Sequence, residues 1–486
     1  MNRTLLVVSG LLLSLGAVHS FTQNGGGDMV ARIKTEGLQR SRAMVLYRYL
    51  TDDVGARLTG SPAHKQAANW ALDRFREFGL ANPHLEPYEF GHGWQTEGIS
   101  VEMTEPRYQR LIAYPDAWTP ATKGVISGRV VYVGDENASQ IQAMSGQLKG
   151  AIVLVHLPVT NWVDHDRPQP ALNDQPIATG NPTLPGPKST TPLNELMPLL
   201  QKAGAAVALK ASAYRDGTVG VTGNRNTPPD SVPAIEVAGE QYNILARLAA
   251  AGKPVTMRVE LRARYIEDDR NSYNVVAEIP GRDPARRDQI VMIGGHLDSW
   301  HTAAGATDNA DGAVAVMEAM RILQVAGAQP RRTIRVALWS GEEQGLLGAA
   351  AYVKQHFATQ AAKNQLDVYL SDDPGSGKRL GLYMVINRAA KAMFDRWLEP
   401  LKELGATRNI IEGIGSTDHV SFNDAGMPGF NVIKDFDSYD ARTRHTNADY
   451  PERMSEDELK ESAIFMATFA YQAAMADEKV PRASIK

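Results

Sequence analysis

From residue 271 onward, the sequence alternates regularly between short apolar runs and longer amphipathic stretches. The apolar runs are rich in β-branched residues, as strands buried on both faces are. They occupy residues 271–281, 288–296, 331–340 and 366–373. Between them, the stretches at 311–327 and 344–357 have helical spacing. Strands that alternate with such helices predict an α/β fold, in which helices cover both faces of a mostly parallel sheet.

Histidine and acidic residues follow these predicted strands, at the ends where the chain leaves them. The stretch GGHLDSW at 294–300 places His296 and Asp298 at the end of one strand. Open α/β sheets bind ligands beyond the carboxyl ends of their strands, so these positions are candidates for a functional site. The candidates are His296, Asp298, Asp308, Glu342, Glu343, Asp373 and His445.

The residue types in this set favour a metal site. Imidazole nitrogens and carboxylate oxygens suit borderline divalent ions such as zinc, and two neighbouring ions need a carboxylate that both share. Residues i and i+2 of an extended chain point the same way, so Asp298 can accept a hydrogen bond from the far nitrogen of His296. The adjacent Glu342 and Glu343 cannot easily bind the same ion, which favours one as ligand and the other as proton carrier.

Each of these residues alone has a simpler interpretation. A lone His296 is typical of a hydrogen-bonded core histidine, and acidic residues such as Glu342 and Glu343 before a helix complement the helix dipole. The joint occurrence of all the candidates at strand ends favours the metal site.

The motifs GGHLDSW, GATDNADG, LWSGEEQGLLGA, SDDPG, STDHVSF and RHTNAD, in this order, resemble those of the M28 family of metallo-exopeptidases. Within that family, the sequences HLDSW and EEQG are most similar to those of the carboxypeptidase Q branch (plasma glutamate carboxypeptidase). The resemblance covers roughly residues 40–475 and implies the zinc exopeptidase fold. It also implies a smaller, β-rich inserted domain that resembles the protease-associated (PA) domain.

The resemblance implies a role for each candidate at two zinc ions. His296 and Asp373 hold one ion, Glu343 and His445 hold the other, and Asp308 bridges both. Glu342 is the general base, and Asp298 orients His296. A cis peptide bond between Asp308 and Asn309 is implied as well.

The sequence departs from the family pattern at two places. Asp372 and Asp373 form a pair where the family usually has one ligand; Asp373 is preferred because DPGSG matches the family's turn, and Asp372 is the alternative. Tyr450 stands where a threonine is common, which concerns the local support of His445.

The predicted organisation is a signal peptide, a catalytic domain in two parts and an insertion between them. Arg3 precedes an apolar stretch that ends near Ser20, which is typical of a secretory signal, although a retained membrane anchor is the alternative. We therefore expect a secreted or periplasmic protein without a membrane span in the mature chain. The segments are 1–20 for the signal peptide, 21–114 and 263–486 for the catalytic domain, and 115–262 for the inserted PA-like domain.

Composition restricts the chemistry and the partners. The chain has no cysteine, so a metal site must use histidine and carboxylates, and its net charge of −4 gives no indication of nucleic-acid binding. Trp300, Asp418 and His419 are candidates for the substrate pocket; for Trp300 simple packing, and for Asp418 and His419 direct metal binding, are the alternatives. The similar branch also implies a homodimer.

The expected function is hydrolysis of peptide bonds at chain ends or in dipeptides, by water that zinc activates and Glu342 deprotonates. The sequence leaves open whether the enzyme is an aminopeptidase, a carboxypeptidase or a dipeptidase. Two alternatives remain: a catalytically inactive PA-domain binding protein, and a single-zinc acyltransferase like glutaminyl cyclase on the same fold.

Overall fold

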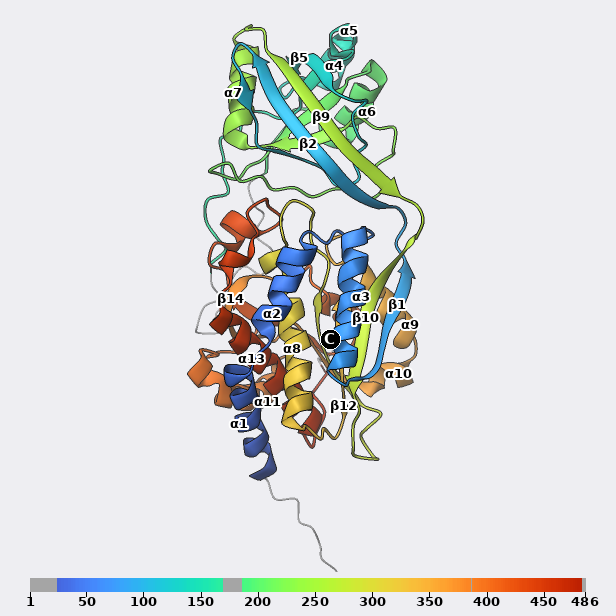
Figure 1. Ribbon diagram of the computed structural model, residues 1–486, viewed down its shortest axis with the longest axis vertical. Helices are drawn as coiled ribbons and strands as arrows, with labels where there is room; N and C mark the ends of the chain where they lie inside the picture. The colour runs from blue at the N-terminus through green and yellow to red at the C-terminus, as the bar shows by residue number, and fades with distance from the viewer. Residues whose placement is uncertain (1–23, 169–185, 386, 483–486) are drawn as a thin grey trace, which may run out of the picture.

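The computed structural model describes residues 24–168, 186–385 and 387–482 (Figure 1). The predicted signal peptide at 1–20 lies outside these residues. Within the described part of the chain, no helix has the length and apolar character that crossing a membrane requires.

The first of two sheets is a seven-stranded mixed sheet. In spatial order its strands are β1 (Ala81–Glu89), β10 (Asn271–Ile279), β12 (Thr333–Trp339), β11 (Ile290–His296), β13 (Leu366–Ser371), β15 (Gly429–Asp435) and β14 (Ser376–Tyr383). The central strands β12, β11, β13 and β15 pair in parallel. The outer strands β1, β10 and β14 join antiparallel. The α/β prediction with a mixed sheet is confirmed.

Helices cover both faces of this sheet. On one face lie α1 (Asn24–Gln39), α2 (Ala43–Arg48), α3 (Pro62–Glu77), α8 (Asp311–Ala326), α11 (Lys391–Leu398) and α13 (Glu456–Met475). On the other face lie α9 (Leu347–His356), α10 (Gln360–Gln365) and α12 (His419–Asp424). Strand β11 explains this two-sided burial, because Ile293 points into the core of the first face and Met292 into that of the second.

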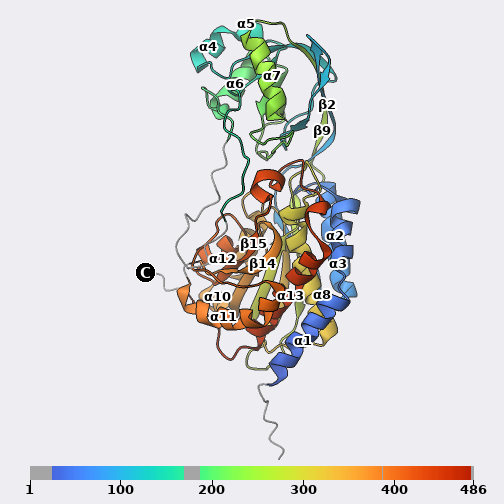
Figure 2. The ribbon, with the colours of Figure 1, turned by 90° about the vertical axis from the view of Figure 1, so that its left-hand side faces the viewer.

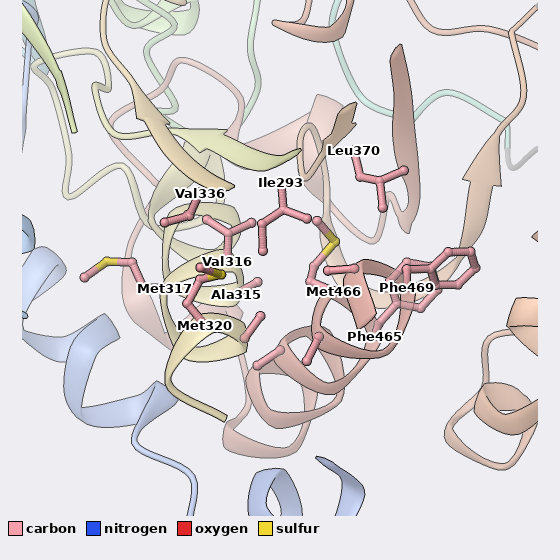
Figure 3. Packing of buried hydrophobic residues seen from close by; sticks show 14 of the residues in the cluster. Ile293, Ala315, Val316, Met317, Met320, Val336, Leu370, Phe465, Met466 and Phe469 are labelled. Carbon is pink, nitrogen blue, oxygen red and sulfur yellow. The ribbon is translucent and has the colours of Figure 1, made fainter. Parts of the chain in front are cut away.

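The larger core lies between the central strands and the helices α8 and α13 (Figure 3). Ile293, Val336 and Leu370 from three parallel strands face Val316 on α8 and Phe469 on α13. Every residue of α8 from Asp311 to Leu323 is buried, as expected of a helix that is packed on all sides. This core fixes the sheet edge from which the candidate residues project.

The second sheet has eight strands and its own helices, and it forms the upper part of the molecule in Figures 1 and 2. In spatial order its strands are β3 (Gln109–Arg110), β2 (Gly93–Glu105), β9 (Thr256–Ile266), β5 (Ile126–Tyr132), β6 (Ile152–Leu154), β7 (Val207–Ala211), β8 (Ala234–Val237) and β4 (Ala113–Pro115). Its helices are α4 (Ala138–Ala143), α5 (Ser145–Leu148), α6 (Leu193–Ala203) and α7 (Gly239–Ala250).

The strands of the second sheet span residues 93–266, a longer stretch than the predicted insertion at 115–262. The difference arises at β2, which pairs along almost its whole length with β9 and so belongs to the second sheet. The chain passes from the first sheet to the second between β1 and β2, and returns between β9 and β10 (Figure 1).

We predict that Phe469→Ala destabilises the protein by about 3–5 kcal/mol, because it removes a large buried ring and leaves a cavity. Phe469 is fully buried and packs on Phe465, with 4.7 Å between the ring centroids. Urea unfolding measures the free energy of unfolding. Val325→Ala is the control: Val325 is 57% exposed on α8, so its loss should change stability by less than about 0.5 kcal/mol. Equal effects of the two substitutions would contradict the assigned core.

Candidate metal centre

The candidate residues meet at the carboxyl edge of the parallel strands. His296 is the last residue of β11, Glu342 and Glu343 follow β12, and Asp373 follows β13. Asp308 lies in the π-helical turn η2 (Ala306–Ala310) before α8. His445 follows β15 and a second such turn, η5 (Tyr439–Thr443). The peptide bond between Asp308 and Asn309 is cis, as the family resemblance implies.

Two groups of side chains in the described residues could each hold a metal ion. One group is His296, Glu342 and Asp373; the other is Asp308, Glu343 and His445. Within each group the potential ligand atoms lie within 4.8 Å of one another. Ligands of one zinc ion, each about 2.0–2.2 Å from it, are of the order of 3–4 Å apart, so both groups have suitable dimensions.

Asp308 lies between the two groups. Its Oδ1 is 3.3 Å from Nε2 of His296, and its Oδ2 is 3.3 Å from Nε2 of His445. Nε2 of His296 is also 3.5 Å from Oδ1 of Asp373, and Nε2 of His445 is 3.1 Å from Oε2 of Glu343. Each carboxylate oxygen of Asp308 thus faces a different group.

Several of these ligand atoms are buried without a hydrogen-bond partner in the described structure. They are Nε2 of His296, Oδ2 of Asp308, Oε1 of Glu343 and Oδ1 of Asp373. Buried polar atoms are normally satisfied, and unpaired ones point to a missing partner. Because three of these four atoms are carboxylate oxygens, a cation fits them and an anion does not.

Burial and neighbouring charges shift the pKa values of these residues in opposite directions. Burial raises the pKa of Glu342 well above its usual value, and it raises that of Glu343 as well. Burial also acts to raise the pKa of Asp308, but hydrogen bonds with His296 and His445 outweigh it and hold this pKa well below the usual value. Burial acts to lower the pKa of His445, whereas Glu343 and Asp308 raise it to about 9. The two imidazoles therefore compensate only part of the buried negative charge.

Asp298 contacts both His296 and the turn that carries the two glutamates. Nδ1 of His296 donates to the backbone carbonyl of Asp298 over 3.0 Å, while Oδ1 of Asp298 lies 3.7 Å away. The imidazole tautomer that this bond fixes still leaves Nε2 free to bind a metal. The Asp298 carboxylate also accepts hydrogen bonds from the Thr59 hydroxyl at 2.9 Å and from the backbone N–H groups of Glu342 and Glu343 at 3.3 and 3.4 Å. Asp298 thus holds the turn that carries both glutamates.

Asp373, and not its neighbour Asp372, faces the site. Asp372 is fully buried in a cluster of charges, where one oxygen lies 3.0 Å from both Nη2 of Arg379 and Nζ of Lys434. Asp311 at the start of α8 contacts the same two cations. The backbone carbonyl of Asp372 also accepts a hydrogen bond from the side chain of Asn309 at 2.8 Å. The cluster therefore ties the turn with Asp373 to the turn with Asp308.

A cavity of about 370 Å³ opens beside the two groups. It is lined by Asp308, Glu342, Glu343, Gly345, Leu346, Asp373, Pro374, Ser416, Tyr439, Arg444 and His445. The predicted pocket residues Asp418 and His419 are absent from this lining; they are 0% and 1% exposed. His419 begins α12, and its Nδ1 hydrogen bonds to the Thr417 hydroxyl; Ser416 lines the cavity in its place.

Trp300 lies beside the second group. Its ring centroid is 6.0 Å from that of His445, and it faces Asp308 and Glu343 across a small adjoining cavity. The structure therefore places Trp300 at the site, and its role in substrate binding stays a prediction.

Three residues that support the site were not predicted. Asp449 accepts hydrogen bonds from the backbone N–H groups of Thr307 and Asp308, at 2.8 and 3.2 Å, and so fixes the turn before α8. Thr59 contributes from outside the quoted motifs, whereas Arg444, like Asp449, lies within RHTNAD. Asp449 is the last residue of the motif RHTNAD, so the motif could have indicated it as a site residue. Thr59 lies far away in the sequence, and no motif indicated that it belongs to the site.

The second sheet and its loops contact the loop that carries His445. The backbone N–H of Val221 donates to the carbonyl of His445 at 2.8 Å, and Gly220 bridges to Thr446. On the other side of this loop, Asp166 accepts hydrogen bonds from the backbone N–H groups of Ser438 and Ala441, at 2.6 and 2.8 Å. The part of the chain with the second sheet thus holds the loop of a candidate ligand at several points.

Comparison with known proteins agrees with this geometry. The sequence profile described as Peptidase family M28 matches residues 274–470. The chain is 26% identical to carboxypeptidase Q of Mus musculus over 454 residues, which cover 93% of this chain and 90% of that protein. It is 25% identical to carboxypeptidase Q of Homo sapiens over 455 residues, 93% and 89% of the two chains.

Solved structures show the same fold. A peptidase M28 precursor from Shewanella amazonensis SB2B superposes with a TM-score of 0.71 at 21% identity, over 96% of this chain and 100% of that one. BSAP, a zinc aminopeptidase from Bacillus subtilis, superposes with a TM-score of 0.62 at 17% identity, over 90% and 96%.

The fold, the paired groups of histidine and carboxylates, and the sequence likeness together define a metallopeptidase. Residues 274–470 match peptidase family M28, and most of the chain is similar to carboxypeptidase Q. The resemblance seen in its motifs is confirmed.

We predict that Thr59→Val lowers the free energy of unfolding by about 1–3 kcal/mol, the cost of leaving a buried polar group without its partner. The Thr59 hydroxyl donates to Asp298 and accepts from the backbone N–H of Gly341 at 3.1 Å, and valine has the same shape without these bonds. Thr59→Ser, which keeps the hydroxyl, is the matched control. Urea unfolding of the zinc-saturated variants checks this, and a valine variant as stable as the serine variant would contradict it.

Proposed function

We propose that the protein is an exported di-zinc exopeptidase, which hydrolyses peptide bonds at chain ends or in dipeptides with Glu342 as general base. The observation that carries the proposal is the position of Asp308, with one oxygen toward His296 and the other toward His445. Export rests on the predicted signal peptide at residues 1–20.

Zinc is the ion that this set of ligands favours. Imidazole and carboxylate, without thiolate, are the ligands of many catalytic zinc sites, and the chain has no cysteine. The structural neighbour from Bacillus subtilis is described as a zinc aminopeptidase. His296 and Asp373 would hold one ion, Glu343 and His445 the other, and Asp308 would contact both.

Bound zinc supplies Lewis acidity, which lowers the pKa of a water molecule and polarises the scissile carbonyl. The chain supplies the proton transfer. Glu342 lines the cavity beside His296, with its Oε2 4.0 Å from Nε2. It takes a proton from the attacking water and returns it to the nitrogen of the leaving amine. Asp298 keeps this carboxylate in place through its hydrogen bond to the backbone of Glu342.

The paired geometry favours this function over the two alternatives. A single-zinc acyltransferase requires only one group of ligands, whereas here a second group surrounds His445. A binding protein without catalysis requires no carboxylate in the position of Glu342, which faces the cavity from the carboxyl end of β12.

We predict that Glu342→Gln lowers the rate of dipeptide hydrolysis by at least about 100-fold, the contribution typical of a general base, and leaves the zinc content unchanged. The substitution keeps the shape of the side chain and removes the proton acceptor. Glu343→Gln is the matched control, because the same change in the neighbouring residue should reduce the zinc content. Steady-state rates and elemental analysis measure both effects. A Glu342→Gln variant with more than about a tenth of the wild-type rate would exclude Glu342 as the base.

We predict that Asp308→Ala loses both zinc ions or retains only one weakly, because both groups share this carboxylate. Elemental analysis after dialysis against a weak chelator gives the zinc content per chain. Asp288→Ala, which removes an 85% exposed carboxylate, should retain the wild-type zinc content. Unchanged zinc content in Asp308→Ala would contradict the shared position of Asp308.

A further inference from the structure

Arg444 brings a positive charge to a cavity wall that is otherwise rich in carboxylates. It lines the cavity of about 370 Å³ together with Asp308, Glu343 and His445. Among the described lining residues it is the one arginine or lysine. Its side chain is 18% exposed and lines the cavity.

The guanidinium of Arg444 is not committed to a partner within the described structure. It makes no hydrogen bond there, and its one ion pair, to Oδ1 of Asp440, is long at 3.9 Å. The Asp440 carboxylate is already engaged by Arg167, whose Nε and Nη2 each donate to it over 2.5 Å. Arg444 therefore keeps its planar set of donors for a ligand.

The backbone around Arg444 is firmly held, which gives the side chain a defined origin. Its N–H donates to the carbonyl of Tyr439 at 2.8 Å, and its own carbonyl accepts from the Tyr214 hydroxyl at 3.2 Å. Tyr214 belongs to the second sheet's part of the chain, so both parts of the molecule fix this position. A donor group held in this way loses little conformational freedom when it binds a ligand.

We propose that Arg444 binds the free α-carboxylate of the substrate, so that the enzyme acts on dipeptides or on C-terminal residues of short peptides. This inference rests on the proposed peptidase function. A guanidinium binds a carboxylate through two parallel hydrogen bonds, a geometry that a neutral C-terminal amide cannot match. The cavity volume is near the lower end of the range of about 300–1,000 Å³ for small-ligand sites, which suits a short segment beyond the scissile bond.

A purely structural role for Arg444 predicts a different result. If the guanidinium served only to balance Asp440 and Asp308, its loss would lower stability or zinc content and would affect all substrates equally. Carboxylate binding instead predicts a loss that is confined to substrates with a free carboxyl terminus.

The test compares alanyl-leucine with alanyl-leucine amide, using the zinc-loaded full chain. We expect the wild-type protein to favour the free acid by about 10–100-fold in kcat/KM, the value of a charge-assisted bidentate contact. Arg444→Gln should reduce this ratio to about one, mainly by raising KM for the acid, while Arg444→Lys should retain part of it. Zinc content and the unfolding midpoint of each variant show whether it is folded and loaded.

Arg442→Gln is the matched control. Arg442 lies on the same loop, but its side chain contacts Thr218 and Asp216 instead of the cavity. It should keep the wild-type preference for the acid. Equal cleavage of acid and amide by the wild-type protein, or an unchanged ratio in Arg444→Gln, would overturn the inference and leave the proposed function intact. If the zinc-loaded wild-type protein cleaved neither compound nor any other peptide, both would be overturned.

Discussion

Four carboxylates and two imidazoles are packed together at one buried edge of the first sheet, and this concentration of negative charge constrains the structure around it. Charge of one sign is costly to bury, and the two imidazoles can compensate at most half of it. Several of the ligand atoms have no hydrogen-bond partner in the described structure, although they are buried. Divalent cations would compensate the buried negative charge and would also bind the atoms that lack a hydrogen-bond partner. The electrostatics and the hydrogen bonding of the site therefore both favour a metal site.

The side chains that face the site depend on a layer of residues behind them. Asp298 accepts hydrogen bonds from the turn with Glu342 and Glu343, and Asp449 does the same for the turn with Asp308. Next to Asp373, the buried Asp372 forms ion pairs with Arg379 and Lys434. Gly312 shows how tightly these turns approach one another, because a Cβ there would lie 2.2 Å from the carbonyl oxygen of Asp372. Each candidate ligand is thus held in its orientation by contacts within the chain.

The sequence was sufficient to predict the first sheet and the residues that meet at its edge. An apolar run predicts a buried strand, and a histidine or acidic residue at its carboxyl end predicts a candidate ligand. β11 and its last residue, His296, are an example in which a few consecutive residues indicate both. It was not sufficient where a contact depends on distant segments. Thr59 reaches Asp298 across more than two hundred residues. Asp418 and His419 belong to one of the quoted motifs, but both are buried and do not line the cavity. The pairing of β2 with β9 has no local signal, so the extent of the second sheet was underestimated.

The loop with His445 makes the second sheet's part of the chain a structural component of the site. The family profile matches residues 274–470, yet Asp166, Arg167, Tyr214 and Val221, which hold this loop, all lie before that region. Arg167 engages Asp440 and thereby leaves the donors of Arg444 to the cavity. The segment that carries the second sheet therefore contacts, through one loop, both a candidate metal ligand and the wall of the cavity. Substitutions in this segment are therefore expected to alter the charge of the cavity wall while the residues of the two candidate groups stay the same.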